Sequence, residues 1–582
     1  MTNQVRQSLS YDASLAEHGL EPFESSGSDV EKTSSKSIRS RTRGFGKKIG
    51  TYGGVKLRIF RKVSLRVWLI VAVINIAITT IITTTIQVSK SKPMDLASMH
   101  PDDIPLSYTS LASKKDAPFV EGCQIPDTTQ PRADAAFVVL VRNSELDDVI
   151  KSMNSLERHF NQWFHYPWVF LNDEPFSDEF KETVKQYTSS EIEFGLVPQK
   201  EWNFPNEVDP LEFYESIESQ GDRGILYGNL VSYHKMCRFY SGYFYKHELV
   251  KKREWYWRVE PNVEFFCDIT YDPFIEMEKH NKKYGFNVLN NEFYYTVPGL
   301  FRETKKYINE KNIQLGSLWK LFIHDSKYTY GKNKSKYDGL TNKQQVASEA
   351  SKNMILEKFL ELRNKKDSEV EDFDSEIMDK LFEGVDKKPE LYEDRIDQEE
   401  YNLCHFWSNF EIARTDLFTN PVYEEYFQHL EKSGGFYKER WGDAPVHSLG
   451  VGMMLNLEDI HYFRDIGYRH TTIQHCPKNH PNQLPYVPSE TFVNKLTPKQ
   501  ERYWLNFDTP GTAGSGCRCR CPWLAPDVEF RKPHCTKKWR ELTRDSYTPR
   551  ELIDVDFWED EARKKIQINL DSGKKLGKDS GF

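Results

Sequence analysis

The sequence predicts an α/β domain with a mostly parallel central sheet, preceded by one transmembrane helix. Two observations carry this prediction: an uncharged apolar stretch near the N-terminus and a strand–helix–strand spacing further along. With 582 residues, the chain could hold one large domain or several smaller ones. A net charge of -8 argues against nucleic-acid binding, because contact with a phosphate backbone needs an excess of Lys and Arg.

The apolar stretch covers residues 67–88, which contain no charged side chain and are mainly Ile, Val, Leu, Ala and Thr. A helix of this length reaches about 33 Å, enough to cross the hydrocarbon core of a bilayer. Residues 36–66 carry eleven basic and no acidic side chains, so the positive-inside rule predicts a cytosolic N-terminus. The stretch begins too far into the chain for a cleaved signal peptide, and we expect a type II signal anchor.

The rest of the chain divides by composition. Residues 1–66 are predicted to be a disordered cytosolic tail that is basic near the membrane, and residues 89–130 a lumenal stem. We expect the folded domain to cover 131–545, with a charged helical insertion at about 325–398. Residues 546–582 are predicted to form a polar tail.

The nine cysteines suit a lumenal location, where disulfides persist, and their odd number leaves at least one outside any intrachain pair. The cluster Cys517, Cys519, Cys521 and Cys535 could be interpreted as a zinc site. A C-x-C-x-C run, however, lacks the two-residue spacers common in structural zinc sites. We therefore expect disulfides in this cluster.

The folded domain is predicted to begin with a strand–helix–strand unit. Residues 137–141 form a continuous apolar run, as a strand buried on both faces does, and residues 166–171 are predicted to be a second strand. Between them, Ser144 and Asp147 have capping-box spacing for a helix that runs towards Phe160. Such a unit implies parallel strands with ligands at their carboxyl ends.

Glu260 is the first candidate ligand. Residues 255–259 are predicted to be a strand that runs directly into Glu260 and Pro261. A carboxylate at the exit of a strand is where a nucleotide-sugar transferase needs a ligand for Mn²⁺ or Mg²⁺, which neutralises the leaving diphosphate. Acidic residues after strands are also common at turns, and the motif alone leaves both interpretations open.

Two further acids and one histidine are candidates. Glu411 lies among aromatic and apolar residues in the segment 405–413, where it is either a satisfied buried group or a catalytic one. Asp443 follows Trp441, which could support a sugar ring, and His470 is either a nitrogen ligand or a structural side chain. The aromatic content of 14% suits stacking against sugars and a nucleobase, or an aromatic-rich core.

Together these segments resemble the fungal KTR family of Golgi mannosyltransferases, glycosyltransferase family 15. The resemblance covers roughly residues 135–476, interrupted by the charged insertion, and its long motifs occur in one order. The matching stretches are 137–143, 164–176, 232–239, 256–265, 404–413 and 438–448. The insertion and the cysteine-rich C-terminal part depart from the family pattern, which leaves the linkage and the acceptor open.

The resemblance implies a GT-A-type nucleotide-sugar-binding domain that uses GDP-mannose and Mn²⁺ and retains the anomeric configuration. It implies that Glu260 and His470 are the metal ligands. It further implies that Glu411 lies under the anomeric carbon, as a nucleophile or as the stabiliser of an ion pair. Tyr233 is expected at the reaction centre, and Asp443 on the acceptor side as a candidate general base.

The residues that the resemblance places near the nucleotide are Arg142, Asn143, Asp173 and Arg238. The partners it implies are GDP-mannose, mannose-containing glycoprotein acceptors and the Golgi membrane, with no nucleic acid. The expected function is a metal-dependent retaining α-mannosyltransferase of secreted and cell-wall glycoproteins. The alternatives are a non-catalytic lumenal glycan-binding protein of the same fold, and a glycoside hydrolase that uses Glu260 and Glu411 as a carboxylate pair.

Overall fold

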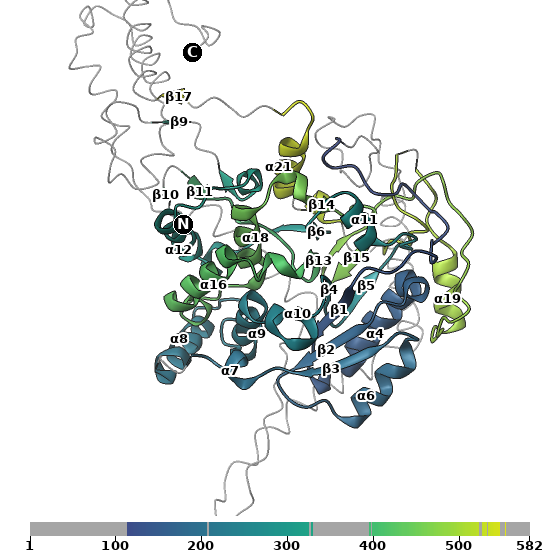
Figure 1. Cartoon of the computed structure of the whole chain (residues 1–582), viewed down its shortest axis with the longest axis horizontal. Helices are drawn as coiled ribbons and strands as arrows, with labels where there is room; N and C mark the ends of the chain where they lie inside the picture. Colours follow the sequence, from purple (N-terminus) through teal and green to yellow (C-terminus); the bar gives the residue numbers. More distant parts are fainter. Residues whose placement is uncertain are drawn as a thin grey trace, which may run out of the picture. The chain divides into compact units, whose positions relative to one another are not determined.

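The computed structural model describes residues 113–205, 209–324, 328–329, 395–396, 399–511, 513–522, 527–531, 533–547 and 553–554 (Figure 1). The predicted cytosolic tail and anchor, the first part of the predicted stem, and nearly all of the insertion and polar tail lie outside these residues. Within the described ranges, no helix is both long and apolar enough to span a membrane.

A seven-stranded sheet forms the centre of the domain, in the order β14-β6-β13-β4-β1-β2-β3 (Figure 1). Strands β4, β1, β2 and β3 are parallel neighbours, β6 and β14 are parallel to each other, and β13 alone runs against both of its neighbours. The predicted strand–helix–strand unit and the mostly parallel sheet are therefore confirmed. The strands are β1 (Ala135–Leu140), β2 (Trp168–Asn172), β3 (Ile192–Leu196), β4 (Trp255–Val259), β6 (Tyr284–Phe286), β13 (Phe410–Arg414) and β14 (Ile460–Tyr462).

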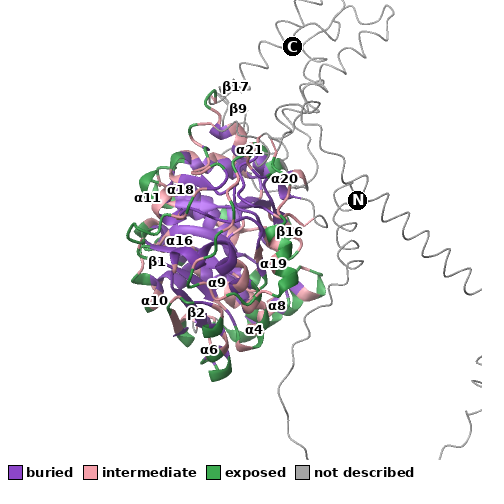
Figure 2. Ribbon diagram, turned by 90° about the vertical axis from the view of Figure 1, so that its right-hand side faces the viewer, coloured by how far each residue is buried: buried purple, intermediate pink, exposed green. Residues whose placement is uncertain are grey.

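Helices cover both faces of this sheet, because alternate residues of the buried strands point to opposite sides. Val138 and Tyr256 pack with helices α9, α10, α12, α16 and α18, whereas Phe137 and Trp257 pack with α4, α6 and α11. Figure 2 shows the resulting buried interior, with exposed residues on the outer sides of the helices and in the loops. The helices are α4 (Leu146–Leu156), α5 (Gln162–Phe164), α6 (Asp178–Val184), α7 (Gln199–Trp202), α8 (Pro210–Asp222), α9 (Val231–Gly242), α10 (Glu248–Lys251), α11 (Pro273–Lys279), α12 (Leu300–Lys311), α16 (Pro421–Ser433), α17 (Gly435–Lys438), α18 (Asp443–Met454), α19 (Pro498–Leu505), α20 (Val528–Arg531) and α21 (Pro533–Thr543).

The described residues also form four smaller sheets. Their orders are β16-β15-β5, β12-β7, β10-β11-β8 and β17-β9. Their strands are β5 (Val263–Phe265), β7 (Leu289–Asn291), β8 (Ile323–His324), β9 (Tyr328–Thr329), β10 (Arg395–Ile396), β11 (Glu399–Tyr401), β12 (Cys404–Phe406), β15 (Tyr468–His470), β16 (Ile473–His475) and β17 (Ile553–Asp554). The sheet β16-β15-β5 is the one that carries His470.

The first helix starts differently from the prediction. A 3₁₀ turn, Asn143–Glu145, precedes α4, and the Glu145 carboxylate accepts a hydrogen bond from the Arg142 backbone N–H at 2.9 Å. The predicted capping box on Ser144 and Asp147 is therefore wrong, because the N-cap is Arg142, two residues earlier. The helical path continues through a π-helix, Glu157–Asn161, as the predicted run towards Phe160 requires.

Eight of the nine cysteines form four disulfides, and Cys237 is free and buried. The pairs are Cys123–Cys517, Cys267–Cys519, Cys404–Cys535 and Cys476–Cys521. The disulfide interpretation of the C-terminal cluster is confirmed, since every sulfur that could have bound zinc is already bonded to another sulfur. The first pair also joins the predicted stem to the domain, and Asp116 and Cys123 in that segment are buried.

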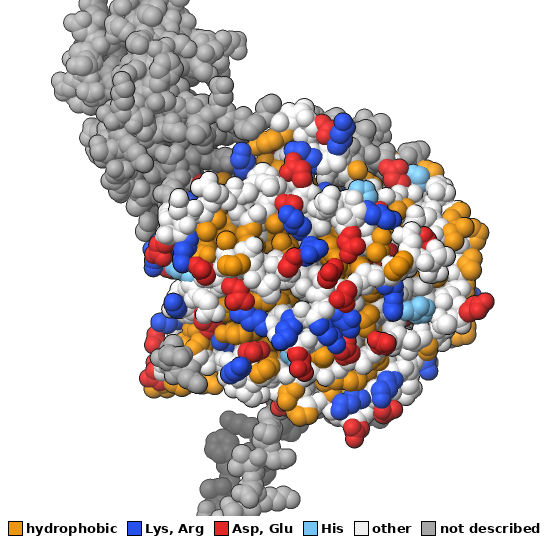
Figure 3. All heavy atoms as spheres, in the orientation of Figure 1, with side chains coloured by type: hydrophobic (Ala, Val, Ile, Leu, Met, Phe, Trp, Pro, Cys, Tyr) orange, Lys and Arg blue, Asp and Glu red, His pale blue; other side chains and the backbone are white. Residues whose placement is uncertain are grey.

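On the face in Figure 3, Lys and Arg alternate with Asp and Glu over the described surface and form no continuous basic patch. Electrostatic affinity for a nucleic-acid backbone requires basic side chains gathered on one face. This face therefore offers no such attraction.

The buried Glu157 gives a prediction for the pH dependence of stability. Its Oε1 accepts hydrogen bonds from Asn161 Nδ2 and Trp168 Nε1, both at 2.8 Å, and burial raises the pKa of its carboxyl from 4.5 to about 7. The folded state therefore holds this proton more tightly than the unfolded state does. The corresponding stability, about 3 kcal/mol, is complete below pH 4.5 and is lost as the pH rises through about 7.

We expect Glu157→Gln to flatten this part of the stability curve, because Gln keeps the accepting oxygen and does not ionise. Urea unfolding of both proteins at about pH 5 and about pH 8 tests it. An unchanged pH slope in the variant would contradict the assignment of the slope to Glu157.

Candidate active site

Three adjacent parallel strands, β2, β1 and β4, end at one edge of the central sheet, and predicted site residues follow each of them. Asp173 follows β2, Arg142 and Asn143 come just after β1, and Glu260 follows β4 directly. The Asp173 charge acts on the Arg142 guanidinium. Ligands of parallel sheets bind at this edge, so the structure brings these four predicted residues to a suitable place.

Arg258 on β4 joins two of the predicted residues. Its Nε lies 2.7 Å from Glu260 Oε1, and its Nη1 lies 2.5 Å from Asp443 Oδ2. The guanidinium carbon lies 3.4 Å from the ring centroid of Tyr240, and Ser408 Oγ donates to Asp443 Oδ2 at 2.7 Å. Burial alone would raise the pKa of the Asp443 carboxyl, but Arg258, His447 and Ser408 together outweigh it and the pKa is lowered. Asp443 is therefore a carboxylate held in one orientation.

Glu260 has an oxygen, and His470 a neutral ring, that a divalent cation could bind. Burial raises the pKa of the Glu260 carboxyl against the effect of Arg258, and its Oε2 has no hydrogen bond from the described residues. Burial, with Arg258, lowers the pKa of His470 to about 4, so its imidazole is neutral near pH 7. A neutral imidazole is the form that binds metals.

The side-chain nitrogen Nδ2 of Asn409 lies 2.8 Å from Nδ1 of His470. With the amide turned so that its oxygen accepts the Nδ1–H, the lone pair on Nε2 is free for a metal. Within the described residues, no three His, Cys, Asp or Glu side chains form a metal-binding group. A cation here would take Glu260, His470 and further oxygens from phosphate and water, which Mn²⁺ and Mg²⁺ accept readily.

Glu411 on β13 lies opposite Arg258 of β4 in the strand register and has no exposed surface. Its carboxylate accepts hydrogen bonds from the Tyr256 hydroxyl and from the Tyr284 hydroxyl, the latter at 2.5 Å. His447 Nδ1 lies 2.9 Å from its second oxygen. Burial would raise the pKa of Glu411, but His447 and the two phenols lower it, so the group is a carboxylate.

His447 is the cation of this buried pair. It lies on α18, four residues after Asp443, and its Nε2 is 2.9 Å from the backbone oxygen of Tyr240. Since a carboxylate faces Nδ1 and a carbonyl faces Nε2, only the imidazolium can donate to both. Burial lowers the pKa of His447, but Glu411, Asp443 and the Tyr240 carbonyl together outweigh it and the pKa is raised.

Tyr233 lies in the first turn of α9, with its ring 4.9 Å from that of Tyr227. Arg440 Nη1 donates to its hydroxyl at 3.4 Å, and Arg440 also pairs with Glu292 at 3.3 Å. Burial raises the pKa of the Tyr233 phenol well above its ordinary value, and the Asp443 charge acts in the same direction. Tyr233 therefore keeps its proton and is available as a hydrogen-bond donor next to Asp443.

The residues that the resemblance places near the nucleotide form two groups, which differ in where they lie. Arg142 is half-exposed and Asn143 fastens the loop after Asp173, donating to the Pro175 carbonyl at 3.1 Å and accepting from Ser177 N–H at 3.0 Å. These residues line the open edge of the sheet. Arg238 is instead 2% exposed, and its contacts are all with the protein itself.

The Arg238 guanidinium donates to both carboxylate oxygens of Glu431, at 2.7 and 3.0 Å, and to the carbonyls of Glu201 and Asn203. Its Nη2 donates to the Tyr243 hydroxyl at 3.0 Å. These bonds occupy the faces of the guanidinium that a nucleotide would need. The geometry favours a structural role that ties α9 to α16 over the nucleotide contact that the resemblance implies.

We expect Arg238→Gln to lower the free energy of unfolding by about 3 kcal/mol or more, because it removes the cation of a buried ion pair. The affinity for nucleotide should stay unchanged. Urea unfolding and a nucleotide titration of the same preparation check both statements. Lost nucleotide binding at unchanged stability would restore the predicted nucleotide role.

A sequence model of the family described as glycolipid 2-alpha-mannosyltransferase matches residues 108–395 and 368–483, more than half of the chain. The chain belongs to this mannosyltransferase family. It is 48% identical over 461 residues to the probable mannosyltransferase KTR5 of Saccharomyces cerevisiae, covering 78% of this chain and 87% of that relative. It is 43% identical over 430 residues to O-glycoside alpha-1,2-mannosyltransferase homolog 5 of Schizosaccharomyces pombe, covering 73% and 83%.

The X-ray structure of the mannosyltransferase Ktr4p from S. cerevisiae in complex with GDP is similar at 29% identity, with a TM-score of 0.49. That similarity covers 75% of this chain and 90% of Ktr4p. The family matches confirm the predicted KTR-type family and the predicted enzyme class, a mannosyltransferase.

Sequence reasoning missed two charged residues in the site of this mannosyltransferase, Arg258 and His447. A signal existed for the first, since Tyr256, Arg258 and Glu260 alternate along one predicted strand and must share a face. His447 lies four residues after Asp443, the spacing of one helix face. Its pairing with Glu411 links segments 36 residues apart and has no local signal.

Proposed function

We propose that this mannosyltransferase moves mannose from GDP-mannose to mannose-terminated N- or O-linked glycans, with Mn²⁺ and with retention of the anomeric configuration. The observation that carries the proposal is the pairing, through Arg258, of Glu260 and Asp443 at the carboxyl edge of the sheet. It places a candidate metal ligand and a candidate acceptor-side carboxylate at one site. The names of relatives support the chemistry, among them the alpha-1,2 mannosyltransferase KTR1 of S. cerevisiae, and we propose the α-1,2 linkage.

Glu260 and His470 would hold the cation. When bound, the cation supplies positive charge to the diphosphate and so stabilises GDP as the leaving group. Arg258 fixes one Glu260 oxygen at 2.7 Å and leaves the other for the cation. Arg142, Asn143 and Asp173 lie at the neighbouring strand ends, where the nucleotide would bind.

Asp443 is better suited to orient the acceptor hydroxyl than to deprotonate it. Its lowered pKa makes it a weak base at neutral pH, and a general base works best with a pKa near the working pH. Arg258 and Ser408 both bind its Oδ2, which leaves Oδ1 to accept from a sugar hydroxyl. Tyr233 keeps its proton and can donate a hydrogen bond beside it.

The surroundings of Glu411 favour retention through an ion pair over retention with Glu411 as the nucleophile. A nucleophile must approach the anomeric carbon, whereas this carboxylate is 0% exposed and already accepts from two phenols and an imidazolium. A buried, fixed negative charge instead stabilises positive charge that develops on the sugar ring. We therefore assign Glu411 to the stabilisation of an oxocarbenium-like ion pair.

We further propose that the enzyme is a single-pass type II protein of the Golgi membrane with its catalytic domain in the lumen. The support is the uncharged stretch 67–88 behind a basic segment, together with four disulfides that persist in an oxidising compartment. Microscopy of a tagged full chain against Golgi markers, with protease protection of the C-terminus in sealed vesicles, tests it. Protease access to the catalytic domain in intact vesicles would contradict it.

The decisive assay uses the full chain in detergent with GDP-mannose and a panel of mannose-terminated acceptors, with and without Mn²⁺. Metal-dependent transfer, with an α-1,2-linked product, supports the proposal. Absence of transfer with every acceptor and metal would favour a glycan-binding accessory protein. Release of mannose from the acceptors without nucleotide would favour a hydrolase.

A further inference from the structure

The sheet β16-β15-β5 carries His470 at the far end of its middle strand. His470 pairs with Val263 of β5 and with Ile473 of β16. The turn after it holds Thr471 at φ 51°, a left-handed conformation that β-branched residues rarely adopt. Such a turn persists only where the surrounding structure holds it. The position of His470 therefore depends on what fixes the base of this sheet.

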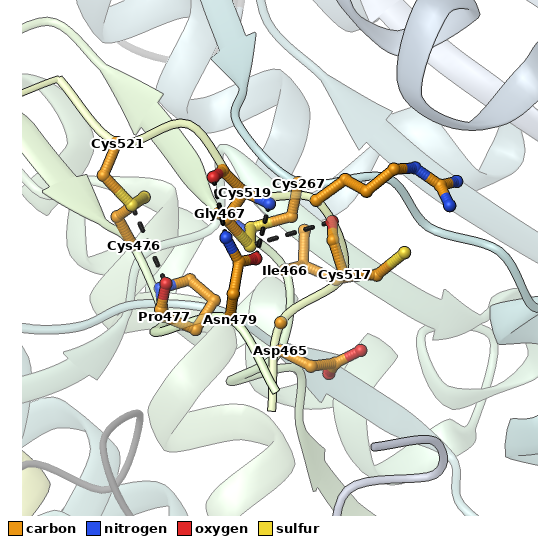
Figure 4. Close-up of a disulfide and its surroundings, with 12 residues drawn as sticks. Cys267, Asp465, Ile466, Gly467, Cys476, Pro477, Asn479, Cys517, Cys519 and Cys521 are labelled. Atoms are coloured by element: carbon orange, nitrogen blue, oxygen red, sulfur yellow. Dashed lines mark hydrogen bonds between the residues drawn. A yellow bond between two sulfur atoms is a disulfide. The ribbon is translucent and has the colours of Figure 1, made fainter. Parts of the chain in front are cut away.

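Both outer strands are bridged at the base to the same short segment, residues 517–521 (Figure 4). Cys267, two residues after β5, is bonded to Cys519, and Cys476, the residue after β16, is bonded to Cys521. The register pairs the end of β5 with the start of β15 and the end of β16. The two bridges are thus at one end of the sheet, and His470 is at the other.

The middle strand is packed directly on both bridges. The N–H of Gly467, which precedes β15, lies 3.2 Å from Cys267 Sγ. A Cβ at Gly467 would come within 2.8 Å of Cys267 Sγ, 2.9 Å of Phe266 Cβ and 3.4 Å of Cys476 Sγ. No side chain fits there, so all three strands are held at their base by residues 517–521.

This segment is itself firmly attached to the domain. Asn479 accepts from the Cys519 N–H at 2.6 Å and donates to the Cys519 carbonyl at 3.0 Å. Arg518 Nε donates to the buried Asp268 at 2.5 Å, and Cys517 is bonded to Cys123. The family model ends at residue 483, so the segment lies beyond the region that defines the family.

We propose that residues 517–521, here called the cysteine clamp, are positioning residues for the metal ligand His470. The inference rests on the proposed function, in which His470 and Glu260 hold the cation. The clamp fixes one end of the sheet β16-β15-β5. Because the three strands are paired along their length, this limits the movement of His470 and of the turn at Thr471 at the other end. Loosening the clamp should therefore weaken cation and nucleotide binding while the central sheet stays folded.

The first test removes one bridge from the full chain with the double variant Cys267→Ser and Cys519→Ser. The readout is the Kd for Mn²⁺ in the presence of GDP, from the electron paramagnetic resonance signal of free Mn²⁺, without turnover. Residues that orient metal ligands typically change affinity by about 10- to 100-fold, and we expect a loss of that size. The matched control is Cys404→Ser with Cys535→Ser, a bridge between β12 and α21, which should leave the Kd unchanged.

The second test keeps every disulfide, so it still decides the question if the double variant Cys267→Ser and Cys519→Ser does not fold. Gly467→Ala forces β15 away from the two bridges and should raise the Kd for Mn²⁺ in the same direction. Gly511→Ala, where the nearest atom is 3.8 Å from the new Cβ, is the control with room for a methyl group. Amide hydrogen exchange of residues 468–475, without metal or nucleotide, should become faster in Gly467→Ala and not in Gly511→Ala.

The Kd for Mn²⁺ and the hydrogen exchange together distinguish a failure of the clamp proposal from a failure of the proposed metal site. If the wild-type chain binds no Mn²⁺ with GDP, the proposed metal site is wrong, and the exchange experiment still decides whether the clamp orders the His470 turn. If Gly467→Ala changes neither the exchange of 468–475 nor the Kd for Mn²⁺, the clamp is wrong. An equal loss of Mn²⁺ affinity in the Cys404 and Cys535 control would also overturn it.

Discussion

Replacement of Glu411 by Gln is expected to lower kcat by at least about a hundredfold while the affinity for GDP stays largely intact. The reason is that the carboxylate is a preorganised negative charge opposite Arg258 in the strand register, and it makes no contact with the open edge where the nucleotide would bind. Gln keeps the size of the side chain and removes the charge. Steady-state kinetics and a GDP titration measure the two effects separately.

The same change affects folding, because it leaves the His447 imidazolium without its carboxylate in a fully buried place. Breaking such a pair costs about 3–5 kcal/mol, so lost activity alone would not identify a catalytic role. The double variant Glu411→Gln with His447→Gln removes both charges and should recover much of the stability without recovering kcat. Recovery of kcat in the double variant would show that Glu411 acts only in folding.

Tyr284→Phe is the matched control for the hydrogen-bond network. It removes one donor to Glu411, the hydroxyl at 2.5 Å, and keeps the carboxylate charge and the His447 contact. A hydrogen bond to a charged group contributes about 1.5–3 kcal/mol to stability, but the carboxylate charge and its other donors remain, so the effect on kcat should be smaller than that of Glu411→Gln. Equal effects of the two changes would point to geometry and not to charge.

The central sheet was predictable because its strands follow local patterns. Residues 137–141 are continuously apolar, residues 255–259 are bulky and mostly aromatic, and Glu260 follows directly at the strand end. These signals need no knowledge of distant residues. They were sufficient for the strand–helix–strand unit and for the edge of the sheet where ligands bind.

The rest of the site depends on contacts between distant segments. Arg258 and Asp443 are 185 residues apart, and Cys123 and Cys517 are separated by 394, so spacing in the sequence cannot select these pairs. The capping box failed for a different reason. Glu145 accepts from the Arg142 N–H, so the N-cap is Arg142, two residues before Ser144. The contact of Arg238 with Glu431, 193 residues further along the chain, likewise has no signal in the sequence.

Replacement of Glu260 by Ala is expected to weaken Mn²⁺-dependent binding of GDP by about 10- to 100-fold or more. Glu260 directly follows β4 at the nucleotide edge, and Arg258 binds its Oε1, which leaves Oε2 for the cation. Without it, His470 alone remains as the proposed protein ligand. GDP titrations with Mn²⁺ and with excess chelator measure the metal-dependent part of the affinity.

The matched control is Glu264→Gln, four residues along the chain on β5. Glu264 is also a carboxylate paired with an arginine, Arg469, but it lies on β5 and not at the end of β4. Glu264→Gln should leave the Mn²⁺-dependent binding of GDP unchanged, because the loss of one surface ion pair changes the free energy of unfolding by about 1 kcal/mol or less. If Glu260→Ala behaved like Glu264→Gln, the cation would have to be held elsewhere. Equal GDP affinity with Mn²⁺ and with chelator in the wild type would remove the need for a protein-held cation at this edge of the sheet.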